Sequence, residues 1–210
     1  EGTTGNDTID LSSLTFDFFN GSITVEGDEG NDVITGTSAA DTITGGEGEN
    51  TYNSSEGADK YTVTTDSEGS AAEEATFNYS DVSHSDYSTG MPLDGTTVDT
   101  FDFAGIDGES DNFSNSTLDL SAVWTGDALT FDQISFDSGK TSYDANDVDF
   151  TDDRVVIQST DDPGDPIAQG FAFIDNNDSG TLDDGDMVVQ LQGLQNLDQN
   201  DFNSDLFVTA

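Results

Sequence analysis

The sequence has very few cationic residues: three Lys and Arg residues stand against 45 Asp and Glu, a net charge of −42. A charge of this size repels nucleic acid and anionic membrane surfaces, which are therefore excluded as partners. Self-repulsion would also oppose a compact fold unless cations neutralise it, so a bound divalent metal is expected. Because hydrophobic residues make up 32% of the chain and 14 are Phe, a β-rich core is expected rather than disorder.

Other absences narrow the class of protein. The chain has no cysteine, so disulfides cannot brace it. No apolar run reaches the roughly 18 residues of a membrane span, and the first ten residues lack the basic and apolar regions of a signal peptide. The single histidine, His84, cannot supply the two that an HExxH zinc protease needs, and no GxSxG motif is present. A carboxylate-pair glycosidase stays open, but nothing marks a pair. We therefore expect no enzyme, and His84 is interpreted as a surface-loop residue.

A nine-residue repeat runs from position 27 to 62, as GDEGNDVIT, GTSAADTIT, GGEGENTYN and SSEGADKYT, with an isolated copy, GTTGNDTID, at 2–10. The first position holds Gly27, Gly36, Gly45 and Ser54. The fourth holds Gly30, Ala39, Gly48 and Gly57. The sixth holds Asp32, Asp41, Asn50 and Asp59, and the eighth holds Ile34, Ile43, Tyr52 and Tyr61. The pattern predicts a turn followed by a short strand in every copy.

Each conserved step of the repeat has a physical use. Glycine permits positive φ in the turn and lets backbone carbonyls crowd towards one point. The carboxylate at the sixth position adds a hard oxygen beside these carbonyls, which suits Ca²⁺ with its six to eight oxygen ligands. The apolar eighth residue points inward, where successive coils stack. The repeat is therefore expected to serve the fold and cation binding together.

These copies resemble the RTX (repeats-in-toxin) nonapeptide GGxGxDxUx, which forms a calcium-binding parallel β-roll. The resemblance implies two nonapeptides per coil, so that turns 18 residues apart share an ion: Asp41 with Asp59, and Asp32 with Asn50 in a weaker site. The departures from the motif are Asn50, Ala39 and the Ser54-Ser55 pair. The calcium-binding residues implied in these repeats are Gly27, Gly30, Asp32, Gly36, Asp41, Gly45, Gly48, Asn50, Gly57 and Asp59.

Three segments follow from the rest of the pattern. Residues 1–63 are expected to form the roll, interrupted at 11–26 by a β-hairpin around the Asn20-Gly21 turn. The Ser/Asp-rich segment 64–97 is expected to be a loop or linker with one short strand near Phe77–Tyr79. Alternating apolar and polar residues predict a compact antiparallel β domain over 98–210. Its expected core is Phe101, Phe103, Leu118, Leu120, Trp124, Phe131, Phe171, Phe173, Val188 and Leu191.

A second motif, DNNDSGTLDDGD, occupies 175–186 and resembles a twelve-residue EF-hand calcium loop set between two strands instead of two helices. The implied ligands are Asp175, Asn177, Ser179, Thr181 through its carbonyl, Asp183 and Asp186, with the sharp turn at Gly180. Asp186 replaces the usual Glu and is shorter, which predicts weaker binding.

The fold class is therefore expected to be all-β: a short calcium-bound parallel β-roll followed by an antiparallel β-sandwich-like C-terminal domain. The C-terminal stretch SDLFVTA resembles the ends of bacterial RTX proteins exported by type I secretion. The expected function is that of an extracellular, cell-surface calcium-binding structural protein, self-assembling into a filament, sheath or S-layer with calcium bridging acidic faces. The alternative is a calcium-folded secretion or carrier module of a larger RTX adhesin or enzyme.

Overall fold

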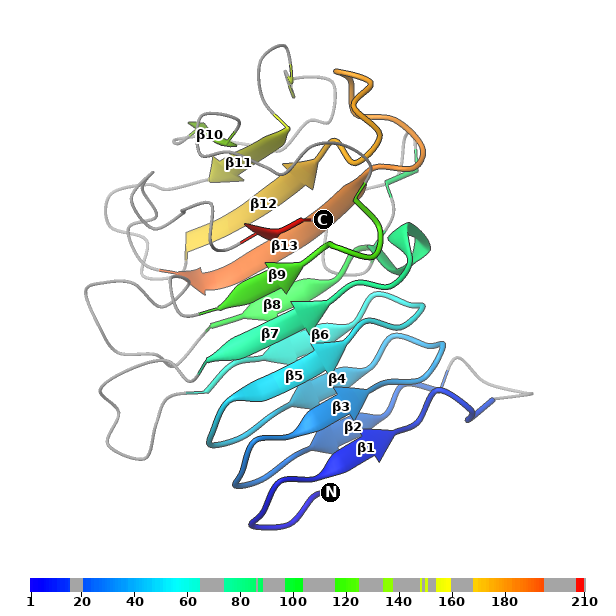
Figure 1. The fold of residues 1–210 in the computed structure, drawn as a ribbon, viewed down its shortest axis with the longest axis vertical. Coiled ribbons are helices and arrows are strands. Elements are labelled where there is room, and N and C mark those ends of the chain that lie inside the picture. Colours follow the sequence, from blue (N-terminus) through cyan, green and yellow to red (C-terminus); the bar gives the residue numbers. More distant parts are fainter. Residues whose placement is uncertain are drawn as a thin grey trace.

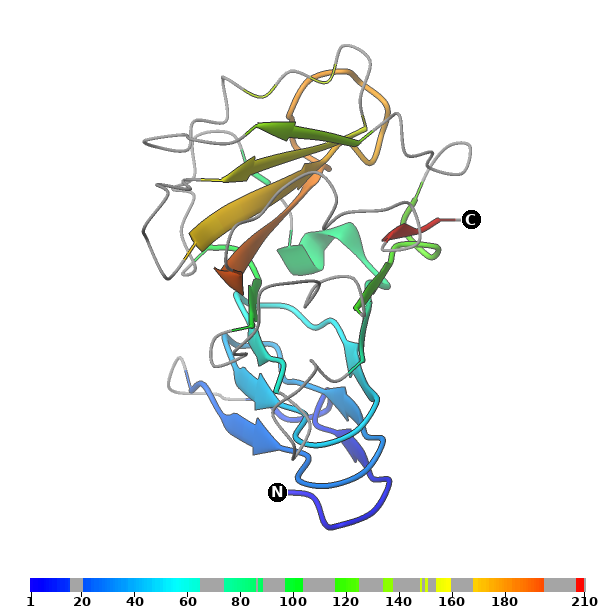
Figure 2. The same cartoon turned by 90° about the vertical axis from the view of Figure 1, so that its left-hand side faces the viewer.

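The computed structural model describes residues 1–15, 21–64, 74–85, 87–88, 97–103, 116–124, 134–137, 148, 150, 154–159, 168–194 and 207–209. Nearly all regular structure in these residues is β, and the one helical element is the 3-10 turn η1 at Val82–Ser85. The strands form two sheets that face each other along the long axis of the molecule (Figures 1 and 2). The all-β fold class is confirmed.

The six-stranded sheet is wholly parallel, and its order is β1-β3-β5-β7-β9-β14. Its strands are β1 (Thr8–Asp10), β3 (Val33–Thr35), β5 (Asn50–Asn53), β7 (Ala75–Asn78), β9 (Thr117–Asp119) and β14 (Phe207–Val208). The eight-stranded sheet has the order β10-β11-β12-β13-β8-β6-β4-β2. Its strands are β2 (Thr24–Glu26), β4 (Thr42–Thr44), β6 (Lys60–Thr62), β8 (Thr100–Asp102), β10 (Ile134–Asp137), β11 (Val155–Ser159), β12 (Ala168–Ile174) and β13 (Met187–Leu194).

The nonapeptides alternate between the two sheets, so one coil takes two copies of the repeat. Ile43 pairs with Tyr61, and Ile34 pairs with Tyr52, each 18 positions apart in parallel register. The first coil is longer, because Ile9 pairs with Ile34 across 25 positions. The extra seven residues correspond to the interruption between 11 and 26. A parallel β-roll is therefore present, as the repeat predicted.

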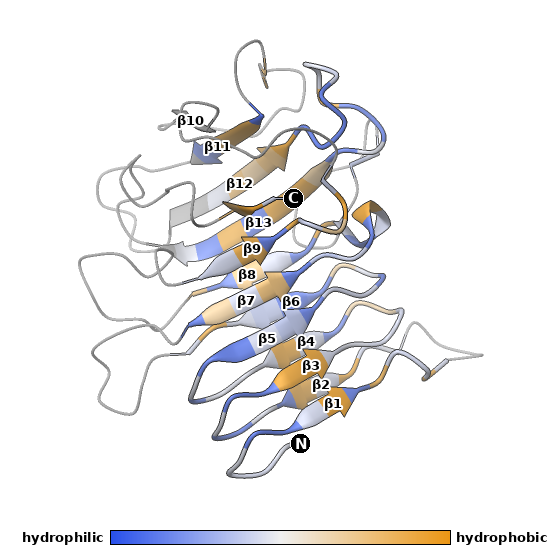
Figure 3. Cartoon of the chain, in the orientation of Figure 1, coloured by the Kyte–Doolittle hydropathy of each residue, from blue (hydrophilic) through white to orange (hydrophobic). Residues whose placement is uncertain are grey.

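The eighth-position side chains fill the space between the two sheets. Ile34, Ile43, Tyr52 and Tyr61 are each at most 2% exposed. Aromatic rings continue the column, with Tyr52 stacked on Phe77 at 5.1 Å and Phe77 on Phe101 at 3.9 Å between ring centroids. Colouring by hydropathy shows hydrophilic residues in the turns and apolar residues on most strands, whereas β5 and β6 are drawn in hydrophilic colours because their inward residue is Tyr (Figure 3). Burial of this column stabilises the roll by removing apolar and aromatic surface from water.

The roll continues beyond the recognisable repeats. Strand β7, expected as an isolated strand in a linker, lies between β5 and β9 inside the six-stranded sheet. Strands β8 and β13 pair in parallel, which joins the C-terminal part to the roll through one continuous sheet. The sheets therefore run across the expected boundaries at 63 and 98, because Phe77 and Phe101 occupy the same inward position as the repeat residues.

The C-terminal part contains the expected antiparallel strands, since β12 pairs antiparallel with both β11 and β13. Strand β10 pairs in parallel with β11. Of the expected core, Phe131 lies outside the described residues, and the following residues are confirmed as buried: Phe101, Phe103, Leu118, Leu120, Trp124, Phe171, Phe173, Val188 and Leu191.

The expected hairpin over 11–26 differs from the structure in its second half. Residues Thr24–Glu26 form β2, which pairs in parallel with β4 as a strand of the roll instead of projecting from it. The reason is that Val25 takes the inward position and is 2% exposed. Much of the expected first strand lies outside the described residues. Among the described residues, no helix is long and apolar enough to cross a membrane.

Candidate metal centre

Sixth-position carboxylates and backbone amides form a ladder along one row of turns. Oδ1 of Asp41 accepts the amide of Ile23 at 2.9 Å. Oδ1 of Asp59 accepts the amide of Asp41 at 2.8 Å. Oδ1 of Asp99 accepts the amide of Asp59 at 2.8 Å. All three carboxylates are buried, so the expected pairing of Asp41 with Asp59 on adjacent coils is present and extends to Asp99.

The second carboxylate oxygen in this row closes its own turn. Oδ2 of Asp41 accepts the amide and the hydroxyl of Thr37 at 2.7 and 2.8 Å. Oδ2 of Asp59 accepts the hydroxyl of Ser55 at 2.8 Å and that of Tyr61 at 3.2 Å. Serine at position 55, a departure from the glycine motif, therefore takes the role that Thr37 has two nonapeptides, or one coil, earlier.

The other row of turns contains a carboxylate oxygen without a partner. Oδ1 of Asp32 accepts the amide of Asp7 at 2.8 Å, whereas Oδ2 is buried and has no hydrogen-bond partner. A Cβ atom added to Gly27 would lie 2.2 Å from this Oδ2 and 2.3 Å from the carbonyl oxygen of Gly45. Burial raises the pKa of Asp32 above its ordinary value. A buried carboxylate oxygen that crowds a glycine together with a carbonyl oxygen, with no donor, fits a hard cation.

In the turn at Asn50, the side-chain amide occupies the place that a cation would take beside an aspartate. Its Oδ1 accepts the amide of Asp32 at 3.0 Å, as a carboxylate does elsewhere in the ladder. Its Nδ2 donates to the carbonyls of Gly46 and Gly48 at 3.1 and 3.2 Å. These carbonyls are of the kind that the repeat is expected to turn towards a cation, and here an amide satisfies them. The role of Asn50 as a calcium ligand is therefore not supported by the geometry.

Backbone geometry requires glycine at three fourth positions, Gly30, Gly48 and Gly57, where φ is positive, whereas Ala39 occupies the remaining one without a positive φ. Gly48 has a φ of +116°, and a Cβ there would lie 2.4 Å from the carbonyl oxygen of Gly30. The turns of successive coils thus pack backbone against backbone. This close approach leaves no room for a side chain between the turn at Gly48 and the turn of the coil before it.

The charge state of the ladder favours a cation. Burial raises the pKa of Asp59 to about 6, despite hydrogen bonds from the Asp41 amide and Ser55. Burial and the charge of Asp59 raise the pKa of Asp99 well above its ordinary value. Among the described residues, the ion pairs of Lys60 with Asp102 and Arg154 with Asp178 lie elsewhere. Nor do three Asp, Glu or His side chains in the described parts converge as a metal cluster, so a cation here would need backbone carbonyls as ligands.

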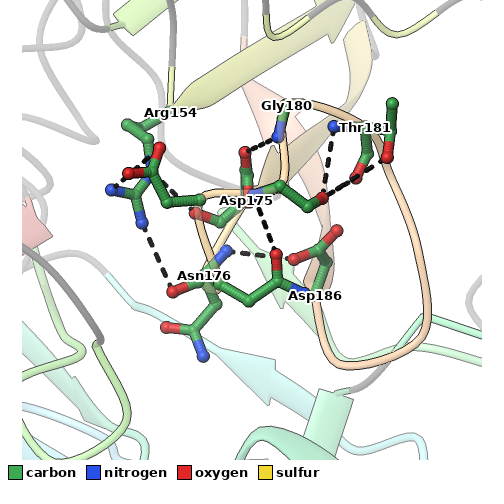
Figure 4. A network of polar contacts seen from close by, with 9 residues as sticks. Arg154, Asp175, Asn176, Gly180, Thr181 and Asp186 are labelled. Atoms are coloured by element: carbon green, nitrogen blue, oxygen red, sulfur yellow. Dashed lines mark hydrogen bonds and ion pairs between the residues drawn. The ribbon is translucent and has the colours of Figure 1, made fainter.

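The second motif forms the tight connection between β12 and β13, as expected for a loop between strands. Asp175 and Asp186, at its two ends, are both 0% exposed. Oδ1 and Oδ2 of Asp175 accept the amides of Ser179 and Gly180 at 3.0 and 2.8 Å. Oδ1 and Oδ2 of Asp186 accept the amides of Asn176 and Asp183 at 3.1 and 2.8 Å (Figure 4). Gly180 makes the sharp turn with a φ of +75°.

The remaining implied ligands of this loop hydrogen-bond to each other. Asn177 donates to Asp183 at 2.9 Å, and the hydroxyl of Ser179 donates to the carbonyl of Thr181 at 2.8 Å. Burial raises the pKa of Asp186 to about 6, and the nearby Asp175 and Asp183 charges add to this. The structure thus brings the six implied residues into one loop, at the expected positions, closed by internal hydrogen bonds.

Arg154, which precedes β11, holds the start of the loop. Its Nε donates to the carbonyl of Asp175 at 2.8 Å, and an Nη donates to the carbonyl of Asn176 at 3.3 Å. Its guanidinium lies over the ring of Trp124, 4.3 Å from the ring centroid. The Arg154 side chain is buried, and its Nη1 lies 3.6 Å from Oδ1 of Asp178, whose side chain is largely exposed. Sequence reasoning missed this contact, because it joins segments far apart along the chain.

Asp99 was also missed. The sequence around it, Asp99-Thr100-Phe101, repeats the Asp-x-apolar end of the nonapeptide, and this signal could have identified the residue. Its Oδ2 accepts the hydroxyl of Tyr79. His84 lies half-buried in η1, with Nδ1 2.7 Å from the hydroxyl of Ser54, so the histidine contacts the roll and is more than a loop residue.

The fold and the buried ladder define a parallel β-roll built from nonapeptides. Residues 26–61 match the model of the RTX calcium-binding nonapeptide repeat in four copies, so this segment consists of RTX calcium-binding repeats. None of the curated proteins matches the chain.

Two similar solved structures are the R3 and R2 subunits of the AlgE6 mannuronan C5-epimerase from Azotobacter vinelandii. The R3 subunit is 19% identical, with a TM-score of 0.31 and coverage of 99% of this chain and 80% of that one. The R2 subunit is 15% identical, with a TM-score of 0.29 and coverage of 100% of this chain and 93% of that one.

Proposed function

We propose that this chain is a secreted calcium-binding structural protein that folds on its calcium ions and assembles outside the cell into a filament, sheath or surface layer. The observation that carries the proposal is the buried ladder of Asp41, Asp59 and Asp99. Carboxylates in dry surroundings on adjacent coils repel one another, so the folded roll needs cations. The four RTX calcium-binding repeats supply the sites.

Calcium binding and folding are one equilibrium on this proposal. The ion binds the turns only when coils lie in register, so its binding free energy stabilises the folded chain. At low cytosolic calcium the net charge of −42 keeps the chain extended, and at millimolar calcium the roll forms. This coupling supports export of the chain before folding, with the C-terminal segment serving type I secretion.

The loop at 175–186 is proposed as a second calcium site. Asp175 directly follows β12, and Asp186 directly precedes β13. Both carboxylates are buried, and the pKa of Asp186 is raised. When calcium is present, the loop oxygens that now accept internal hydrogen bonds would coordinate the ion. Aspartate in the last position offers a shorter side chain, which makes this the weaker site.

The role is proposed as structural, because the matched repeats are calcium-binding ones and the carboxylates of the ladder are held by backbone amides inside the fold. Calcium would also screen the like charges that oppose contact between copies.

The test is a calcium titration of the EDTA-stripped chain to about 10 mM, followed by circular dichroism and light scattering, with magnesium as control. β-Structure and particle mass that rise together for calcium alone are expected. Folding into a stable monomer would contradict the assembly and favour a carrier module of a larger protein. An absence of any response to calcium would overturn both.

A further inference from the structure

The two edges of the six-stranded sheet run in the same direction. All neighbours in the order β1-β3-β5-β7-β9-β14 are parallel. Among the described strands, β1 pairs only with β3 and β14 only with β9. An open edge offers backbone N–H and C=O groups to a strand of another molecule. Because both edges share one direction, β14 of one copy can extend in parallel onto β1 of the next.

The β1 end retains an acceptor of the ladder that has no donor. Oδ2 of Asp7 accepts the amide and hydroxyl of Thr3 at 2.6 and 2.8 Å, the same closure that joins Asp41 to Thr37. Within the described residues, Oδ1 of Asp7 has no such partner, although the equivalent oxygen of Asp32 accepts the amide of Asp7. In the other coils with an Asp at this position, Oδ1 accepts a backbone amide from the coil before it. Oδ1 of Asp7 therefore lies at the outer side of the first coil as an acceptor for a further coil.

The exposed apolar side chains lie at these same two ends. Among the described residues, the exposed large hydrophobic side chains are Leu14, at 45%, and Val208, at 40%. Leu14 follows β1, and Val208 lies in β14, at opposite ends of the sheet (Figure 1). Of the two, Val208 lies on the edge strand itself, where a neighbouring copy paired to β14 would cover it.

We propose that copies of this chain join head to tail through β14 of one copy and β1 of the next, so that the six-stranded sheets become continuous. This joint rests on the proposed assembly and specifies its contact. Such a contact uses two different surfaces and repeats with the rise and the twist of the sheet, which generates an open helical filament when the rotation does not close. The occupant of each edge is thus a second copy of the same chain.

The register of the joint follows from the register inside the sheet. Val208 pairs with Asp119, and Asp119 is in line with Asn78 and, through β5 and β3, with Asp10. In the same register, Val208 lies beside Asp10 of the next copy. Both side chains belong to the exposed or partly exposed face, so they can be replaced without opening the core.

The absence of cysteine permits a clean cross-linking test in the full chain. The double variant D10C/V208C and the two single variants are assembled in about 10 mM calcium, with EDTA as control. Diamide then removes two hydrogens from a pair of thiols to form each disulfide. The double variant is expected to give a ladder of dimers, trimers and higher products on non-reducing gels, in calcium only. The single variants are expected to stay monomeric on the same gels.

The possible outcomes separate the joint from the function. Cross-linking of D10C alone would mean docking of two N-terminal ends and would overturn the head-to-tail joint. Particles that form without cross-links would also overturn it, while the proposed assembly would stand. A folded monomer that forms no particles in calcium would overturn both proposals.

A charge placed at the joint is a second test. V208D should lower the weight-average mass in calcium at least tenfold, because it places a carboxylate beside Asp10 of the next copy. T42D adds the same charge at an exposed position of β4, outside the six-stranded sheet, and should leave the mass unchanged. Circular dichroism checks that both variants fold. An equal loss of mass in both variants, or in neither, would contradict the joint.

Discussion

Replacing Asn50 by Asp should convert an amide-filled turn into a calcium site. In the protein, Nδ2 of Asn50 bonds the carbonyls of Gly46 and Gly48. The N50D variant loses both bonds, at about 1 kcal/mol each, and adds a buried carboxylate that faces two carbonyl oxygens. At low calcium the variant should therefore be less stable than the wild type by about 2 kcal/mol or more. This corresponds to a folding equilibrium constant lowered roughly 30-fold.

At high calcium the sign should reverse. The carboxylate and the two freed carbonyls would bind an ion, and an ion present at 100 times its dissociation constant stabilises the fold by about 2.7 kcal/mol. Urea unfolding at a series of calcium concentrations should give stability curves for N50D and wild type that cross. Calorimetric titration should count one more ion per chain in the variant.

N6D is the matched control for this experiment. It adds the same charge at an exposed position, and its Oδ1 can still accept the amide of Asn31 at 3.0 Å. Its curve should run parallel to that of the wild type, with no additional ion. If N50D binds no further calcium and its curve also stays parallel, the amide does not stand in for a cation and the reasoning fails.

Three further outcomes are expected. G48A should destabilise the calcium-bound chain by at least about 2 kcal/mol in urea unfolding, because φ at this position is +116° and the new Cβ would meet the Gly30 carbonyl. The control is G5A, which should keep a stability near that of the wild type because no atom lies within 4 Å of its added Cβ. Equal losses of stability in the two variants would refute the stacking of the turns. In the calcium-free chain, the β-structure followed by circular dichroism should decrease as pH rises from about 4 to about 6, because Asp59 has a raised folded pKa of about 6 and binds protons more tightly folded than unfolded. An increase over this range would contradict its burial. D186N should lose one weakly bound calcium ion in calorimetry while the circular dichroism of the roll stays unchanged, whereas D184N, exposed in the same loop, should keep the full number.

Sequence reasoning succeeded where local chemistry repeats. The nine-residue period placed the inward positions of Ile34, Ile43, Tyr52 and Tyr61, because glycine turns and single apolar residues leave one compatible backbone path. The motif at 175–186 was placed between two strands for a similar reason: its flanks alternate in period two. These features depend only on residues close together in the chain.

Sequence reasoning failed where distant segments supply the partner. Strand β7 belongs to the roll because Phe77 stacks between Tyr52 and Phe101, yet no intact nonapeptide surrounds it. Arg154 reaches the loop carbonyls from another strand. Such contacts depend on which coils become neighbours, and composition around each residue does not encode that.

By itself, the sequence determined that this protein is an acidic all-β chain with RTX calcium-binding repeats at 26–61. The nine-residue period and its glycines specify the turns, and the few Lys and Arg residues cannot neutralise the carboxylates in them. The tertiary structure alone decided that the roll and the C-terminal strands share one sheet, that Asp99 extends the ladder, and that an amide closes the turn at Asn50. The physical reason is that a hydrogen bond between coils joins two groups that folding brings together. The residues around either group do not show which partner it will meet.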